Sequence, residues 1–179
     1  GFKLLIIIQE TYMQQIFITS DTHFSHGNII KYCNRPYKTY EEMDEALIEN
    51  WNKVVRQQDK VYHLGDVYFP KYSSRERSEN IFKRLNGTKR LILGNHDNGK
   101  DQLLQKYFKE IYMWRFLKDV GLLLTHVPVH PDSLSNKLTY NVHGHIHNNA
   151  GYYGPRYKNA CVEVNNYTPQ PIEFFIQEK

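Results

Sequence analysis

Apolar runs and amphipathic segments alternate along the first 110 residues of the chain. Short apolar stretches of strand length lie at 14–21, 60–66 and 89–95. The segments 38–57, 73–87 and 100–110 instead place apolar residues at helical spacing. This alternation predicts βαβ units and a largely parallel sheet.

Two of the expected helices carry start and stop signals. Thr39 and Glu42 have the spacing of a capping box, and Ser73 and Glu76 repeat that spacing before the second helix. Gly87 stands where the second helix would stop. One apolar stripe follows the first helix: Met43, Leu47, Trp51, Val54 and Val55.

The second half of the chain has a different pattern. Residues 111–126 resemble a hairpin, with Lys118, Asp119 and Gly121 near its turn, and residues 138–145 and 159–167 have the character of strands. We therefore expect one α/β domain over residues 13–179, with a β-rich second half. Residues 1–12 are expected to be either a leader ahead of a natural start at Met13 or an additional strand.

Composition narrows the class of protein. The 179 residues are 40% hydrophobic and 23% charged, which is typical of a soluble globular protein. A net charge of +4 tolerates an anionic substrate but gives little support to nucleic-acid binding. The apolar run at 4–8 is too short to span a membrane, so no membrane partner is expected. The two separated cysteines exclude a disulfide scaffold and favour free thiols in the cytoplasm.

Aspartate, asparagine or histidine residues follow each of five predicted strands. In open α/β sheets, ligands bind at the carboxyl ends of strands. One solvated loop would explain any single group, but five such groups after apolar runs indicate a common site. They are Asp21-Thr22-His23, Gly65-Asp66, Gly94-Asn95-His96-Asp97, Thr125-His126 and Gly144-His145-Ile146-His147.

Carboxylate and imidazole donors without thiolate favour divalent first-row transition metals, and there are enough of them for two ions. Asp66 is suited to bridge the ions because a carboxylate has two oxygens. If the strand continues through His145 and His147, their side chains lie about 6.6 Å apart on one face, so each could reach a different ion. His143 would then lie toward the core, with a bend at Gly144.

The ordered set of motifs resembles the calcineurin-like metallophosphoesterase superfamily, in particular its small bacterial and phage members. The resemblance implies an α/β fold, a four-layer αββα sandwich of two mixed sheets with a dimetal site at one edge. It assigns one metal to Asp21, His23, Asp66 and His147, and the other to Asp66, Asn95, His126 and His145. It also implies that His96 assists the leaving group. Protein phosphatases continue the second motif with Asp-Arg-Gly, whereas this chain reads GDVYFPKYSS, which argues against that activity.

We expect a metal-dependent phosphoesterase in which a metal-bridging hydroxide attacks phosphorus in line. His96 would donate a proton to the leaving group, with Asp97 as its orienting partner. Manganese is the expected metal, with iron, zinc, nickel or cobalt as alternatives. A phosphodiester is favoured because the compact domain offers no obvious cap over a small monoester. A phosphomonoesterase, a nuclease and a non-catalytic interaction scaffold stay open as alternatives.

Four further residues are candidates for binding the substrate, for which a nucleotide-derived phosphoester is one candidate: His26, Arg35, Tyr152 and Arg156. Tyr152 and Arg156 could stack on a base and pair with a phosphate, although a plain surface loop explains them equally well. His26 could instead cap a helix.

Other polar residues have simpler interpretations. His63 is expected to be a satisfied strand histidine, and His130 to lie in a solvated turn. Gly94 to Lys100 has the spacing of a P-loop, but Asp101 follows where a Ser or Thr should meet Mg²⁺. Its carboxylate would repel phosphates, which disfavours an NTPase.

Overall fold

A computed structural model describes residues 13–135, 140–149 and 153–176 of the chain. The first of its two sheets contains β1 (Ile16–Thr19), β2 (Lys60–His63), β3 (Thr88–Ile92), β4 (Glu110–Tyr112) and β9 (Gln170–Pro171). Their order is β4-β3-β2-β1-β9, and only β9 runs antiparallel to its neighbour. The predicted parallel sheet is therefore confirmed. The prediction for residues 1–12 lies outside the described residues.

The second sheet has the order β5-β6-β7-β8. Its strands are β5 (Arg115–Leu117), β6 (Leu122–Leu124), β7 (Tyr140–His143) and β8 (Tyr157–Asn159). β5 and β6 form an antiparallel hairpin, whereas β6, β7 and β8 are parallel. The hairpin turns through a 3-10 helix (Lys118–Val120) and Gly121, whose φ of 64° suits glycine.

Two predicted strands have different bounds in the structure. The hairpin begins at Arg115, because Glu110–Tyr112 pairs in parallel with β3 and so belongs to the first sheet. The expected strand at 159–167 overlaps the observed strand β8 only at Asn159. β8 stops at Asn159, and a 3-10 helix (Val162–Val164) follows it. Cys161 still makes an isolated bridge to Ser20, so this segment returns to the end of β1.

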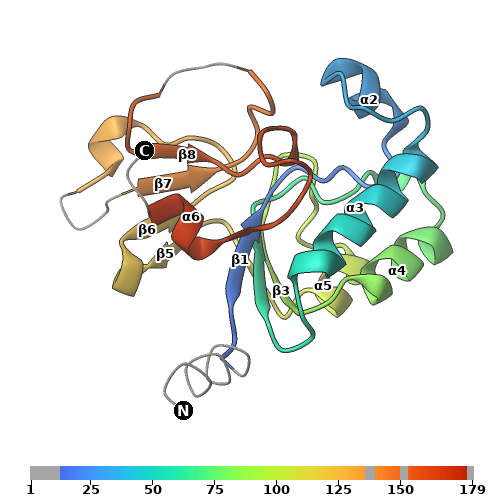
Figure 1. Cartoon of the computed structure of the whole chain (residues 1–179), viewed down its shortest axis with the longest axis horizontal. Helices are drawn as coiled ribbons and strands as arrows, with labels where there is room; N and C mark the ends of the chain where they lie inside the picture. The colour runs from blue at the N-terminus through green and yellow to red at the C-terminus, as the bar shows by residue number, and fades with distance from the viewer. Residues whose placement is uncertain (1–12, 136–139, 150–152, 177–179) are drawn as a thin grey trace, which may run out of the picture.

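Helices cover the outer face of the first sheet. Figure 1 shows α3 (Tyr40–Val54), α4 (Arg75–Arg84) and α5 (Gln102–Tyr107) on one side of β1 and β3, and the second sheet on the other side. The short helix α2 (Gly27–Tyr32) follows the loop after β1. The last helix, α6 (Ile172–Ile176), contacts β1 and β9 of the first sheet and β7 of the second. The prediction of two mixed sheets with flanking helices is confirmed. None of the helices in the described part of the chain combines the length and the apolar character of a membrane span.

Two apolar clusters hold these layers together. One joins the helices to the first sheet and includes Met43, Trp51 and Phe82. The other lies between the sheets and includes Ile18, Leu124 and Val142. Burial of such side chains stabilises the fold by about 25 cal/mol for each Å² of apolar surface removed from water.

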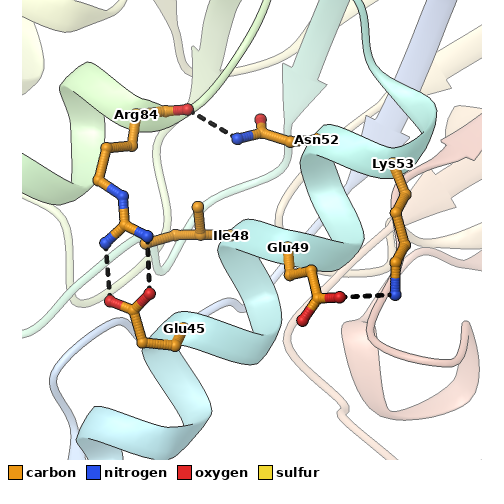
Figure 2. Close-up of a pocket in the computed structure, with 6 residues that line it drawn as sticks. All are labelled: Glu45, Ile48, Glu49, Asn52, Lys53 and Arg84. Atoms are coloured by element: carbon orange, nitrogen blue, oxygen red, sulfur yellow. Dashed lines mark hydrogen bonds and ion pairs between the residues drawn. The ribbon is translucent and has the colours of Figure 1, made fainter.

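The helix starts show which local signals the fold uses. Thr39 caps α3 by accepting a hydrogen bond from the Glu42 N–H, as predicted. The second cap is one residue later than predicted, because Ser74, not Ser73, accepts from the Arg77 N–H. On the surface between α3 and α4, a shallow pocket is bordered by charged pairs, among them the two-bond pair of Arg84 with Glu45 (Figure 2).

Candidate metal centre

The loops that follow β1, β2, β3, β6 and β7 converge at one edge of the two sheets. Backbone hydrogen bonds join them: the Asp21 N–H donates to the Gly65 carbonyl, and the Gly144 N–H donates to the His126 carbonyl. The approach is so close that a Cβ on Gly94 would collide with the Asp66 carboxylate. A Cβ on Gly144 would likewise collide with Asp21. Glycine is required at both positions.

The backbone of these loops is strained at the predicted ligands themselves. Five of the seven predicted metal ligands have positive φ, a region that residues other than glycine rarely adopt. They are Asp21 (57°), His23 (50°), Asp66 (56°), His145 (70°) and His147 (50°). Such conformations persist only where the surrounding structure imposes them, and they cluster at functional sites.

A first group of donors is formed by Asp21, His23 and His147. Asp21 Oδ1 lies 3.8 Å from His23 Nε2 and 3.7 Å from His147 Nε2. The side chains of Asp21 and His23 are buried, while that of His147 is 17% exposed. The group therefore lies inside the protein with one histidine at its rim.

A second group is formed by Asp66, His126 and His145. Asn95 joins it, because its Oδ1 lies 2.8 Å from His126 Nε2 and 2.9 Å from His145 Nδ1. His145 and Asn95 are exposed, so this group opens to solvent. Asp66 Oδ2 lies 3.5 Å from His126 Nε2 and also 3.5 Å from His23 Nε2, and Asp66 therefore stands between the two groups.

The two aspartates present their oxygens in the same way. Ser20 Oγ and the His145 N–H donate to Asp21 Oδ2 at 2.5 and 2.9 Å, and the His96 N–H donates to Asp66 Oδ1 at 2.9 Å. In each residue one oxygen is fixed by protein donors and the other faces the imidazoles. Asp21 Oδ1 and both ring nitrogens of His23 are buried without a hydrogen-bond partner among the described residues.

Two of the histidines are oriented by the nitrogen that faces away from the centre. His126 Nδ1 lies 2.8 Å from the Leu64 carbonyl oxygen, which can only accept, so Nδ1 carries the proton. His147 Nδ1 donates in the same way to Glu163 Oε1 at 2.9 Å. In the neutral rings both Nε2 lone pairs then face oxygen atoms of the centre. Acceptors that converge in this way, together with unpartnered buried atoms, fit cations between them.

Electrostatics supports this interpretation. Burial would raise the pKa of the Asp21 carboxyl, but His23, His126 and His147 outweigh burial and hold that pKa below its usual value. Burial lowers the pKa of His147, but Cys33, Glu163 and Asp21 outweigh it and raise that pKa to about 10. Without a metal, a proton on His147 balances the carboxylates, and a divalent ion would replace it.

The structure corrects the reasoning that separated His145 from His147. β7 ends at His143, so the alternation of side chains on a strand does not apply to the two residues. Their positive φ values instead send His145 toward Asn95 and His147 toward Asp21 and Glu163. The expectation that His143 lies toward the core is confirmed, because it is buried and its Nδ1 contacts the Gly144 carbonyl oxygen.

Glu163 is a site residue that the sequence reasoning missed. It orients His147, and Arg35 in turn donates to its Oε1 through Nε (2.9 Å) and an amino group (2.6 Å). Arg35 also donates to the backbone carbonyls of Asp21 and Thr22. Its side chain is 0% exposed, so the prediction that it binds substrate is wrong. In the sequence, Glu163 is an acidic residue between Val162 and Val164, and this isolated position was the signal that could have identified it.

His96 and Asp97 have separate surroundings. His96 is exposed, and its ring centroid lies 5.8 Å from that of His23 and 5.3 Å from that of Phe69. The Asp97 carboxylate accepts from the backbone N–H groups of Asp66, Val67 and Gly94. Asp97 therefore fixes the loop that carries the ligands, whereas its predicted contact with the His96 ring is not among the contacts in the structure.

The other predicted substrate residues are dispersed. His26 is 8% exposed and stacks on Phe69 beside the first group; burial lowers its pKa to about 4. Its side chain makes no capping hydrogen bond to α2. Arg156 donates to the backbone carbonyls of Leu134 and Ser135. Tyr152 lies outside the described residues.

The simpler interpretations of His63 and His130 are confirmed. His63 is buried, contacts Thr22 Oγ1 at 2.9 Å and accepts from the Gly65 N–H. His130 is 74% exposed. The P-loop alternative is disfavoured further, because Asp101 caps α5 by accepting from Leu103 and Leu104, where a phosphate would have to lie.

The fold and the site define an α/β protein with paired His/Asp groups at the edge of two mixed sheets. Comparison with known proteins gives the family. The calcineurin-like phosphoesterase model matches residues 15–166, and the chain belongs to this family. The predicted resemblance is confirmed.

Three relatives show how far the similarity extends. Uncharacterized protein MJ1445 of Methanocaldococcus jannaschii is 38% identical over 174 residues, covering 92% of this chain and 91% of its own. The crystal structure of AQ665 from Aquifex aeolicus, a protein of unknown function, superposes with a TM-score of 0.74 at 30% identity, covering 90% of this chain and 97% of the other. The Gene 66 protein of Mycobacterium phage L5 is 34% identical over 85 residues, which are 48% of this chain and 41% of the phage protein.

Proposed function

We propose that the protein is a dimetal-dependent phosphodiesterase that uses manganese. The observation that carries the proposal is the pair of adjacent donor groups that share Asp66, each with an oxygen or nitrogen left facing inward. Carboxylate and imidazole donors suit manganese, iron, zinc, nickel or cobalt. Membership of the phosphoesterase family supports phosphoester substrates, and the diester preference is the further step.

Two divalent ions, when bound, would supply an activated water for in-line attack and positive charge for the phosphoryl oxygens. The protein's own residues arrange this chemistry. Asp66 sets the spacing of the two groups, and Glu163 and Leu64 fix the ring orientation of His147 and His126. His96 is exposed beside His23 and can donate a proton to the oxygen of the leaving group.

The openness of the second group supports a diester over a small monoester. His145 and Asn95 are exposed, so a substrate with substituents on both sides of phosphorus can approach. A phosphomonoesterase or a nuclease on the same residues is the alternative activity. A non-catalytic scaffold is a weaker alternative, since every predicted ligand position is filled by a donor.

A panel of substrates tests the proposal. Protein loaded with Mn²⁺ should hydrolyse bis(p-nitrophenyl) phosphate faster than p-nitrophenyl phosphate, and chelation should abolish both activities. Faster hydrolysis of the monoester would reverse the assignment of substrate class. Two bound ions without hydrolysis of any phosphoester, including 2′,3′-cyclic nucleotides and single-stranded DNA, would favour the scaffold.

We also propose that the protein works in the cytoplasm. Cys33 and Cys161 are both free and buried, which suits a reducing compartment. Fractionation of the native host, followed by detection of the chain, tests this directly.

A further inference from the structure

Three aromatic rings form a surface beside the first donor group. His26 and Phe69 have ring centroids 4.4 Å apart and planes inclined by 16°. Tyr72 lies 5.3 Å from Phe69 and 5.7 Å from His26, with planes inclined by 20° and 4°. The three rings are therefore nearly parallel, and each lies next to both others. We call this group, His26, Phe69 and Tyr72, the aromatic plate.

The backbone holds the plate in place. The Phe69 N–H donates to the Phe24 carbonyl at 3.2 Å, which ties the loop after β2 to the loop after β1. The chain then turns through a 3-10 helix (Pro70–Tyr72), and the Tyr72 N–H donates to the Phe69 carbonyl. Proline at the start of this turn restricts φ and favours the geometry. Tyr72 is thus positioned by local structure.

The plate combines a buried histidine, His26, with an exposed tyrosine, Tyr72. His26 is 8% exposed, whereas Tyr72 is 47% exposed. A cluster that served only packing would bury its largest ring, because an aromatic side chain gains most when it leaves water. Here the tyrosine presents its surface to solvent instead. Lys71 places its ammonium 5.8 Å from the centroid of the same ring.

The plate also reaches the reacting centre. The His26 ring lies 5.5 Å from the ring of His23, and the Phe69 ring lies 5.3 Å from that of His96. A molecule with its phosphoryl group at the donor groups would have its neighbouring substituent close to these rings. A flat, uncharged substituent is the kind that stacks on them.

We propose that the aromatic plate binds the nucleobase of a nucleotide-derived substrate, with Tyr72 as the principal stacking residue. This inference rests on the proposed phosphoesterase function and names its substrate class. Stacking on an aromatic ring tolerates every base, because each base has a π-face. The plate therefore selects nucleotides over sugar phosphates and discriminates little among bases. Loss of one stacking ring typically weakens binding about tenfold or more.

Calorimetric titration of the Mn²⁺-loaded protein with three probes tests the proposal. Adenosine 5′-phosphate should bind about tenfold more tightly than ribose 5-phosphate, which carries the same phosphate and sugar without the base. In Tyr72→Ala this difference should disappear, and in Tyr72→Phe it should persist because the ring remains. Inorganic phosphate should bind equally to all three proteins. Trp114→Ala, at a tryptophan that is 61% exposed elsewhere on the surface, serves as the control.

The outcomes separate the two levels of inference. Equal affinity of wild-type protein for adenosine 5′-phosphate and ribose 5-phosphate, with phosphate still bound, overturns the plate and leaves the metal centre intact. A difference that survives in Tyr72→Ala also overturns the assignment to Tyr72. If the metal-loaded protein binds neither phosphate nor either ester, the proposed function fails and the plate fails with it.

Discussion

Buried aspartates lie at both ends of the strands of the first sheet, which we call its amino-terminal and carboxyl-terminal edges. The hydrogen bonds of these aspartates differ between the two edges. At the amino-terminal edge, Asp59 precedes β2 and is fully buried. Its Oδ1 accepts from the Gln15 N–H and the Arg56 guanidinium, and its Oδ2 accepts from the Arg56 N–H and Nε. At the carboxyl-terminal edge, Asp21 and Asp66 each have one oxygen fixed by protein donors and one turned toward histidines.

The difference shows that burial of a carboxylate does not by itself mark a functional site. Asp59 satisfies both oxygens from its own chain, so nothing further is needed there. Asp21 Oδ1 and the ring nitrogens of His23 lack partners among the described residues, and leaving them unpaired is costly. Because these atoms are buried and unpaired at this edge, a bound ligand is needed to offset the cost. The converging donors indicate that this ligand is a pair of metal ions.

The largest effect is expected from removing the shared charge at the carboxyl-terminal edge. Asp66→Asn keeps the shape of the side chain but weakens binding at both donor groups. Loss of a residue that only orients a ligand costs 10–100-fold, so phosphodiester hydrolysis should fall by more than about a hundredfold. Elemental analysis should find fewer than two Mn²⁺ ions per chain.

The exposed carboxylate of Asp132 provides the matched control, because its side chain is 93% exposed. Asp132→Asn should retain both ions and full activity. The metal-free Asp66→Asn protein should melt at the same temperature as metal-free wild type or higher, since a buried charge has been removed. Unchanged hydrolysis by Asp66→Asn would show that Asp66 is not part of the metal centre.

A second variant separates the two donor groups. Among the predicted ligands, His147 is the one that Glu163 contacts within the described residues. Glu163→Gln should therefore weaken the binding of one ion by about 10–100-fold and leave the other unchanged. Mn²⁺ titration followed by electron paramagnetic resonance measures both affinities. Equal weakening of both ions would show that Glu163 acts on the fold as a whole.

The approximate positions of β1, β2 and β3, the cap of α3 and the types of donor residue could be predicted from local sequence, because each depends on residues close together in the chain. The stripe of Met43, Leu47 and Trp51 is buried as its spacing predicted. The five polar loops could be expected to meet because parallel strands bring their carboxyl ends to one edge.

Features that depend on distant residues could not be predicted in this way. Arg35 and Glu163 are 128 positions apart, and nothing local indicates that they pair. Strand alternation failed at His145 because the strand ended two residues earlier, and the backbone conformation there is imposed by packing around Gly144. Local patterns give the donors, whereas the tertiary structure decides their directions.

A third variant tests the amino-terminal edge. Asp59→Asn replaces two acceptor oxygens with one acceptor and one donor, so some of the hydrogen bonds from Arg56 and Gln15 are lost. Hydrogen bonds to charged groups contribute about 1.5–3 kcal/mol, and the free energy of unfolding should fall by about 2 kcal/mol. Metal binding and hydrolysis should be unchanged. A loss of activity at temperatures where the variant is folded would contradict the separation of the two edges.

The smallest effect is the dependence of stability on pH that Lys89 introduces at this same edge. Lys89 is buried at the start of β3 and donates to the carbonyls of Leu85 and Gly87. Burial lowers its pKa from 10.5 to about 8. Between these values the unfolded chain binds more protons than the folded protein, so stability rises with pH.

Between pH 7 and pH 9, the titration of Lys89 should raise the free energy of unfolding by about 1 kcal/mol, and Lys89→Met should lack this rise. Urea unfolding of the metal-free proteins at the two pH values measures the difference, with Lys53→Met as the control because that side chain is 61% exposed. An equal rise in Lys89→Met would assign the effect to other groups. The expected result would place a stability response at the amino-terminal edge, separate from the metal chemistry at the other.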